Sequence, residues 1–275
     1  TDDARLTLET ALDAKKHGAT IATYTKVVGM VTENGRITGV RVQDQFSGEE
    51  KEIKANSVIN ATGPWSDRTR TLQKEGKLKL RPTKGVHIVF DKERLPINNA
   101  VVCFHPIDGR VLFAIPWGDR TYVGTTDTDF IENLGEVAAT KEDVQYLLEV
   151  SNQYFPKVDL KEEDVIATWA GVRPLLSNEA AEDESQVSRE HVIFVEEDGL
   201  VTIAGGKLTT YRRMATEVVD KSIDWLRLTD KLPSLKRKRK DTAVEALPGG
   251  VGWPDNDDFE AVAAQLLAKT ELEIS

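Results

Sequence analysis

This 275-residue sequence lacks paired cysteines, a long apolar run and a leader pattern. Its single cysteine, Cys103, cannot form a disulfide within the chain, which is typical of a protein from a reducing compartment. The thiol lies in the apolar run Val101-Val102-Cys103-Phe104, so we expect it to be buried and unreactive. No apolar run approaches the ~20 residues of a membrane-spanning helix, and the opening residues do not have the pattern of a signal peptide.

Residue sets for several common chemistries are also missing. The sequence has no zinc-type cluster of cysteine and histidine, no Gly-x-Ser-x-Gly and no Walker loop. Metal-dependent hydrolysis, serine hydrolysis and P-loop phosphoryl transfer are therefore not indicated, and we expect no metal site. The formal net charge of −10 argues against nucleic acid as a partner, because nucleic-acid binding draws on a basic face. Small anionic ligands stay compatible with this charge, since they respond to nearby groups.

The segment at residues 201–213 combines an apolar run, two glycines and a helical pattern. Residues 201–204 are typical of a buried strand, and the apolar residues after the glycines recur at helical spacing. Gly205 and Gly206 predict a tight turn between the two elements. The N–H groups at the start of such a helix attract negative charge, and Lys207 would add a cation. Two interpretations stay open here: an anion or cofactor site, or a tight connection with a solvated lysine.

The rest of the pattern predicts helices, a β-meander and an antiparallel sheet. The meander is indicated by the turn signals Asn34-Gly35 and Ser47-Gly48. The predicted helices begin at a Thr1 or Asp2 cap, at the capping-box pair Thr140 and Asp143, after Gly206 and near Phe259. The predicted strands are 19–24, 27–32, 37–43, 50–54, 57–61, 86–90, 101–104, 110–116, 120–125, 165–170 and 191–196, and 177–186 and 235–240 are predicted to be an exposed acidic loop and a basic linker.

Five side chains that are or can become cations lie at the ends of predicted strands. They are Lys84, His87, Arg173, Arg189 and Lys207. Each one alone is typical of an ordinary surface charge. Together they would form an anion pocket, because guanidinium and ammonium groups grip phosphate or carboxylate with charge-assisted hydrogen bonds.

Six motifs in one order carry a resemblance to a known family. They are Asn60-Ala61-Thr62-Gly63-Pro64-Trp65, Lys84-Gly85-Val86-His87-Ile88-Val89, Phe113-Ala114-Ile115-Pro116-Trp117, Gly124-Thr125-Thr126-Asp127-Thr128, Ala170-Gly171-Val172-Arg173-Pro174-Leu175 and Gly205-Gly206-Lys207-Leu208-Thr209-Thr210-Tyr211-Arg212. In order and approximate spacing the sequence resembles the FAD-dependent glycerol-3-phosphate dehydrogenases from Thr1 to about Leu228.

The resemblance implies an α/β and α+β fold with a partial glutathione-reductase-type FAD domain and a mostly antiparallel substrate sheet. The implied domains are a partial FAD domain at 1–79, a substrate domain at 80–195, a return strand and helix at 196–230, and a linker with the start of a helical domain at 231–275. The implied reaction oxidises sn-glycerol 3-phosphate to dihydroxyacetone phosphate. A hydride passes from C2 to flavin N5, and the electrons then pass to quinone.

The resemblance also implies roles for individual residues. His87 and Arg173 would lie by the reacting carbon, as proton acceptor or electrostatic stabiliser, and the resemblance does not say which is which. Arg189 and Lys207 would hold the substrate phosphate. The implied FAD contacts are Val28 near the adenine half, Ala61, Thr62, Gly63 and Trp65 along the cofactor, and Gly206, Lys207, Leu208 and Thr209 facing the isoalloxazine.

The sequence departs from the family's pattern in three ways. The resemblance implies a dinucleotide-binding motif, N-terminal substrate-contacting residues and a whole C-terminal helical domain, and these residues contain only the beginning of the last. No strand followed by Gly-x-Gly-x-x-Gly is present in these residues, so we expect them alone to bind FAD weakly or not at all and to show no turnover. The resemblance implies a cytoplasmic protein, peripheral on the inner face of the cytoplasmic membrane. Alternatives are an α-glycerophosphate oxidase that uses oxygen, an amine or hydroxy-acid oxidase, and a non-catalytic anion-binding module.

Overall fold

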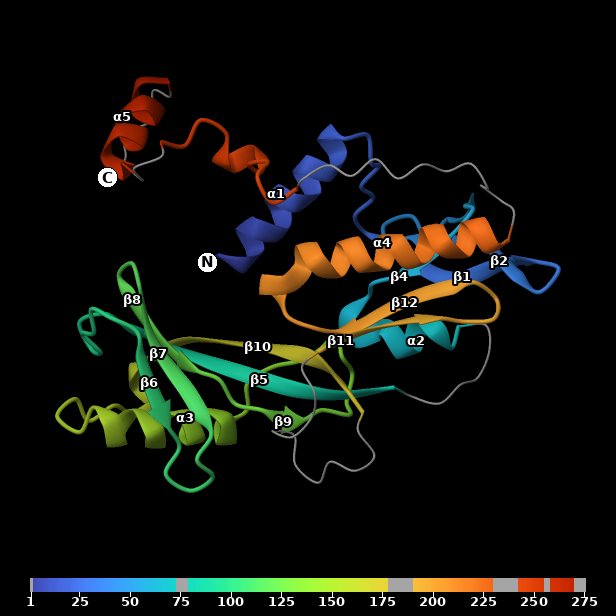
Figure 1. Ribbon diagram of the computed structural model, residues 1–275. Helices are drawn as coiled ribbons and strands as arrows, with labels where there is room; N and C mark the ends of the chain where they lie inside the picture. The colour runs from blue at the N-terminus through green and yellow to red at the C-terminus, as the bar shows by residue number, and fades with distance from the viewer. Residues whose placement is uncertain (1, 73–78, 178–189, 230–241, 255–257, 270–275) are drawn as a thin grey trace. The chain divides into compact units, whose positions relative to one another are not determined.

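The computed structural model describes residues 2–72, 79–177, 190–229, 242–254 and 258–269 (Figure 1). The chain divides into two compact units, one made of Thr1–Thr25 with Leu235–Ser275 and the other of Lys26–Ser234. The four domains drawn from the sequence stay a prediction. The predicted basic linker at 235–240, and the predicted acidic loop beyond Ser177, lie outside the described residues.

The first unit contains helices α1 (Asp3–Lys16) and α5 (Phe259–Lys269). Helix α1 starts at Asp2, whose carboxylate accepts a hydrogen bond from the Arg5 backbone N–H at 2.9 Å. The carboxylate of Glu9 on α1 accepts the Gly249 N–H at 2.7 Å, which joins α1 to the 3-10 turn Pro248–Gly250. Both helices were predicted, but the strand predicted at 19–24 is wrong, because these residues pair with no strand among the described residues.

The second unit begins with a three-stranded sheet of β1 (Thr25–Glu33), β2 (Arg36–Asp44) and β3 (Glu50–Lys54) in that order. Asn34 and Gly35, with φ of 51° and 74°, form the turn between β1 and β2. Such left-handed turn residues match the twist of a hairpin, which is why Asn-Gly favours this turn. The predicted meander is confirmed.

A six-stranded antiparallel sheet follows, in the order β10-β5-β8-β7-β6 with β9 beside β5. Its strands are β5 (Leu80–Asp91), β6 (Val101–Phe104), β7 (Val111–Trp117), β8 (Arg120–Gly124), β9 (Thr128–Asp129) and β10 (Val165–Leu176). The predicted antiparallel sheet is confirmed, although β10 runs well past the predicted end at residue 170.

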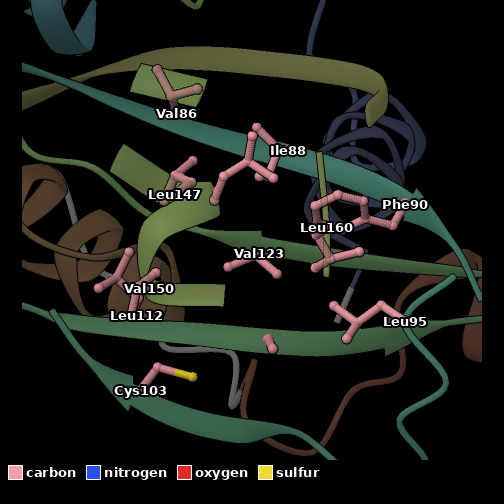
Figure 2. Close-up of a cluster of buried hydrophobic side chains, with 12 residues drawn as sticks. Val86, Ile88, Phe90, Leu95, Cys103, Leu112, Val123, Leu147, Val150 and Leu160 are labelled. Atoms are coloured by element: carbon pink, nitrogen blue, oxygen red, sulfur yellow. The ribbon is translucent and has the colours of Figure 1, made fainter. Parts of the chain in front are cut away.

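One face of this sheet packs against helix α3 (Lys141–Tyr154). Alternate residues of β5, among them Val86, Ile88 and Phe90, meet Leu147 and Val150 of the helix (Figure 2). The cluster includes Cys103, which is buried as predicted, and burial raises the pKa of its thiol. A thiol held protonated in an apolar core is a poor nucleophile.

The third sheet consists of β4 (Val58–Asn60), β12 (Leu200–Gly205) and β11 (His191–Val195). Strand β12 lies between its partners, parallel to β4 and antiparallel to β11. Helix α4 (Tyr211–Leu228) packs on β11 and β12 (Figure 1), and the short helix α2 (Ser66–Arg70) follows β4. None of the helices in the described part of the chain is long and apolar enough to cross a membrane.

Candidate functional site

The carboxyl ends of β4 and β12 lie at one edge of the third sheet, because the two strands are parallel and adjacent. Val58 pairs with Leu200, and Asn60 pairs with Thr202. The turn after β4 therefore lies near the glycine turn that follows β12. Ligands of α/β proteins bind in the crevice at such strand ends, so this edge is a candidate cofactor site.

The buried side chain of Asn60 shapes the turn after β4. Its amide nitrogen donates to the Ser66 carbonyl at 2.9 Å and to Thr202 Oγ1 at 3.3 Å. Its amide oxygen accepts a hydrogen bond from Thr62 Oγ1 at 2.7 Å. These contacts hold the turn to both strands and leave Ala61, Thr62 and the indole of Trp65 exposed to solvent.

The glycine turn after β12 requires its two glycines. Gly205 and Gly206 have φ of 75° and 83°, a region that side chains rarely adopt. A Cβ on Gly206 would lie 2.6 Å from Met214 Cε, so the turn also packs too closely for a side chain. Lys207 and Leu208 follow as exposed residues, and neither the 3-10 turn Leu208–Thr210 nor α4 has a side-chain cap. Backbone N–H groups there can bind an anionic or flat polar ligand.

Strand β10 brings the six-stranded sheet to this edge. Leu176 near its end lies 3.4 Å from the point that a Cβ on Gly205 would occupy. The same strand lies beside the 3-10 turn Gly63–Trp65, and Figure 1 shows β5 and β10 running side by side.

We call the sheet face opposite α3 the open face; its residues used below are Gly85, His87, Trp117, Tyr122, Gly124, Trp169, Gly171 and Arg173.

His87 lies in the middle of the open face, on β5. Its ring stacks on the indole of Trp169 with centroids 5.0 Å apart and has an edge contact with Tyr122 at 5.7 Å. A Cβ on Gly124 would lie 2.2 Å from Cδ2 of His87, so this glycine makes room for the imidazole. Burial, and secondarily the charge of Arg173, lower the pKa of His87 to about 4. His87 is therefore an uncharged imidazole at neutral pH.

Arg173 lies beside His87 on β10 and is held by the segment after β8. Its guanidinium donates to Thr125 Oγ1 at 2.8 Å, to the Thr126 carbonyl at 3.2 Å and to Asp127 Oδ1 at 3.2 Å. Gly85 leaves the space that the guanidinium fills, since a Cβ there would lie 2.4 Å from Nη2. These contacts fix the direction of a permanent cation next to a neutral imidazole.

Gly171 lies on β10 between Trp169 and Arg173 and faces the same side, because alternate residues of a strand share a face. Unlike at Gly85 and Gly124, no atom of the residues that the structure describes lies within 4 Å of the point that a Cβ on Gly171 would occupy. The open face therefore has a gap at Gly171 between the indole and the guanidinium. On the paired strand, Gly85 lies opposite Gly171 and His87 lies opposite Trp169. A small polar substrate can lie there in contact with both an acceptor and a cation.

The predicted site residues fall into three groups. The structure brings together His87 and Arg173, and it places Ala61, Thr62, Gly63 and Trp65 at the same sheet edge as Gly206, Lys207, Leu208 and Thr209. Val28 lies half-buried in β1, and Arg189 lies outside the described residues. The cofactor and phosphate roles of all these residues stay predictions.

The prediction that Lys84 joins the anion pocket is wrong. Lys84 shares the face of Val86 and Ile88, and its ammonium binds Asp143 Oδ2 of α3 at 2.6 Å. The same oxygen accepts the Thr140 N–H at 2.8 Å as part of the capping box. Lys84 is thus a buried structural cation on the side of the sheet opposite His87.

Three residues of the site were missed by sequence reasoning: Tyr122, Asp127 and Trp169. Asp127 is buried against Arg173 and also accepts a hydrogen bond from Arg110 through its carbonyl. A signal for Trp169 was present, because Trp169, Gly171 and Arg173 are spaced by two and must share a face of any strand that contains them.

The chain is similar to a known protein family and to named proteins. Residues 1–212 match the family model described as FAD dependent oxidoreductase. The chain is 43% identical over 258 residues to the aerobic glycerol-3-phosphate dehydrogenase of Staphylococcus haemolyticus, and 44% identical over 222 residues to the one of Bacillus subtilis. These alignments cover 93% and 80% of this chain but 46% and 40% of the relatives, so the chain spans less than half their length.

A solved structure gives the same result. The glycerol-3-phosphate dehydrogenase of Bacillus halodurans complexed with FAD has a TM-score of 0.75 and 41% identity, over 82% of this chain and 44% of that chain. The resemblance drawn from the six motifs is confirmed, and so is the predicted fold class, an FAD-dependent oxidoreductase fold with mixed α/β content and antiparallel sheets. The substrate role of the large sheet stays a prediction. The chain belongs to the FAD dependent oxidoreductase family.

Proposed function

We propose that the protein carrying this chain oxidises sn-glycerol 3-phosphate to dihydroxyacetone phosphate with FAD, and passes the electrons to quinone. The observation that carries the proposal is the pair of His87 and Arg173 on the open face. An uncharged imidazole beside a fixed guanidinium can accept a hydroxyl proton while the cation stabilises the oxygen. The names of the relatives support this substrate.

The residues at the shared edge of β4 and β12 fit FAD. Gly63 has φ of 55° and no described atom where a Cβ would lie, and the helix start after Gly205 and Gly206 has no side-chain cap. The residues we propose as contacts are Ala61, Thr62, Gly63 and Trp65 after β4, Gly206, Lys207, Leu208 and Thr209 after β12, and Val28 on the adenine side. When bound, FAD supplies the hydride acceptor.

The roles of the chain's own residues follow from their charges. Oxidation at C2 removes a hydride from carbon and a proton from the hydroxyl group, and we assign the proton to an imidazole nitrogen of His87. Arg173 stays protonated throughout and attracts the C2 oxygen as its negative charge grows. Lys207 and Arg189 are the proposed partners of the substrate phosphate, because a dianion needs cations beyond Arg173.

A quinone acceptor implies that the electrons are transferred at a membrane surface. We propose a cytoplasmic protein that is peripheral on the inner face of the cytoplasmic membrane, where a lipid-soluble quinone is reached. The proposed electron acceptor is tested by measuring how fast the reduced protein is reoxidised by a soluble quinone analogue and by oxygen. Faster reoxidation by oxygen would favour an oxidase.

We also propose that these 275 residues alone bind FAD weakly and do not turn over substrate. They contain no Gly-x-Gly-x-x-Gly turn after a strand, and that turn supplies most of the contacts to a dinucleotide pyrophosphate. The ratio of flavin to protein absorbance after purification measures this. A stoichiometric flavin content would contradict the proposal.

The substrate class is tested by calorimetric titration of the chain with glycerol 3-phosphate, lactate and glycine. We expect glycerol 3-phosphate to bind most tightly and Arg173→Gln to weaken it by at least about tenfold, as the loss of a charge-assisted contact predicts. Lys141→Gln is the matched control, because Lys141 is an exposed cation on α3, behind the sheet. Tighter binding of lactate or glycine would point to a hydroxy-acid or amine oxidase instead.

A further inference from the structure

The imidazole of His87 is enclosed by two aromatic rings from the neighbouring strands. His87 pairs directly with Trp169 across β5 and β10, and their rings are nearly parallel, 23° apart. Tyr122 of β8 meets the imidazole at 72° and the indole at a centroid distance of 5.2 Å. With Gly124 leaving the space for Cδ2, these contacts leave the ring little freedom to rotate.

The charges around His87 do not favour its protonated form. Arg173 is a cation on β10, Tyr122 of β8 offers a phenol, and the nearby carboxylate of Asp127 is already engaged by Arg173. Nδ1 of His87 is buried without a hydrogen-bond partner among the described residues. No carboxylate in the part of the chain that the structure describes pairs with the ring, so its burial favours the uncharged form. The indole of Trp169 is the ring that stacks on the imidazole.

Trp169 has no evident structural reason to be tryptophan. It is 46% exposed and is not part of the hydrophobic cluster under the sheet, whereas its neighbour Ala170 packs against that cluster. A half-exposed indole adds little to the core, so its size is explained by what it covers. What it covers is His87.

We propose that Trp169 is a positioning residue for His87: its indole holds the imidazole in one orientation and shields it from water, so that His87 stays uncharged and ready to accept a proton. The inference rests on the proposed function, since it concerns the proton acceptor of that reaction. It adds that the state of the acceptor is set by an aromatic surface, not by a carboxylate partner.

The experiment is a pH titration of the histidine Cε1 signals by NMR in the 275-residue chain, with His87→Gln identifying the His87 signal. Trp169→Leu removes the stacked ring, and we expect it to raise the His87 midpoint by about one pH unit, because water then reaches the imidazole. Trp169→Phe keeps a ring and should give a midpoint between wild type and Trp169→Leu.

Trp117→Leu is the matched control. Trp117 is 47% exposed on the same face and contacts Tyr122, and no ring contact joins it to His87. We expect its replacement to leave the His87 midpoint unchanged. An unchanged midpoint in Trp169→Leu, or an equal rise in Trp117→Leu, overturns the inference.

The titration can be interpreted independently of misfolding and of the proposed function. The signal of His105, which stacks on Tyr146 at 3.8 Å on the α3 side, reports whether each variant is folded. If Trp169→Leu does not fold, the order of midpoints in wild type and Trp169→Phe still decides, because a smaller ring must shield less. The titration needs no substrate, so failure of glycerol 3-phosphate to bind would overturn the proposed function and leave this result intact.

Discussion

Three glycines on the open face differ in which atoms lie near the point that a Cβ would occupy. Gly85 lies under the guanidinium of Arg173 and Gly124 under the ring of His87, whereas Gly171 has no neighbour within 4 Å of a would-be Cβ. The first two are glycines because another side chain fills their space. No described protein atom requires a glycine at position 171, and we expect a ligand to occupy the space beside it.

Replacing Gly171 by alanine should therefore separate stability from binding. Its φ is not in the left-handed region, so Gly171→Ala should leave the melting temperature unchanged or raise it, since alanine loses less backbone entropy on folding. We expect calorimetry to show binding of glycerol 3-phosphate weakened by about tenfold or more, because the new methyl group enters the gap.

The control for this change is Gly135→Ala. Gly135 is also exposed, also has an ordinary φ, and meets only Asn133 Oδ1 at 3.6 Å. It should leave binding as in wild type. Binding that survives Gly171→Ala would show that the substrate lies elsewhere on the face.

At the scale of elements, α3 is joined to β5 by a buried ion pair. Lys84 and Asp143 have side chains that are 10% and 6% exposed and are 2.6 Å apart. Asp143 also accepts the Thr140 N–H, so one carboxylate both caps the helix and neutralises the lysine. Removing it leaves a buried ammonium without its partner, which is far more costly than losing an exposed pair.

Asp143→Ala should lower the free energy of unfolding by about 3–5 kcal/mol, as expected when one partner of a buried pair is removed. Urea denaturation measures the change. Lys141→Ala on the same helix is the control, because its pair with Glu162 is exposed and should contribute less than about 1 kcal/mol. Similar losses in the two variants would mean that Lys84 finds another partner or water.

Element types could be predicted from the sequence wherever local chemistry decides them. The Asn34-Gly35 hairpin and the capping box of α3 are such cases, since the turn and cap residues act within a few positions. Residues 19–24 have the composition of a strand, but a strand also needs a partner, which local sequence does not supply. The alternation of Lys84, Val86 and Ile88 along one strand is the sequence signal that places Lys84 on the core face.

The site was predictable in its residues more than in its geometry. His87 and Arg173 were identified through motifs, but their adjacency depends on the register of β5 with β10, which no local pattern specifies. The contribution of Trp169 depends on the same register. Long-range pairing is therefore the information that the sequence alone did not provide.

At the scale of the whole molecule, His87 links stability to pH. Its pKa is about 4 in the folded protein against 6.5 for the ordinary value, so between these pH values the unfolded chain binds a proton that the folded one does not. The contribution of the uncharged His87 to the free energy of unfolding is fully present above pH 6.5 and decreases as the pH falls toward 4. At about 1.4 kcal/mol per pH unit, the full change in the pKa of His87 corresponds to about 3 kcal/mol.

His87→Gln should flatten this dependence. We expect the free energy of unfolding of wild type to fall by up to that amount more than that of His87→Gln between pH 6.5 and 4, because glutamine does not titrate. Urea titrations at a series of pH values measure the difference. Parallel curves for the two proteins would mean that the imidazole titrates near its ordinary value.

The parallel pair of β4 and β12 has a kinetic consequence. Asn60 and Thr202, which touch across it, are 142 residues apart, whereas β6, β7 and β8 are joined by short hairpins. Closing so long a loop costs more entropy than closing a hairpin, so we expect the hairpins to form early and the strand pair late. The edge proposed for the flavin would then form last during folding and separate first during unfolding. A ligand bound there would therefore lower the rate of unfolding.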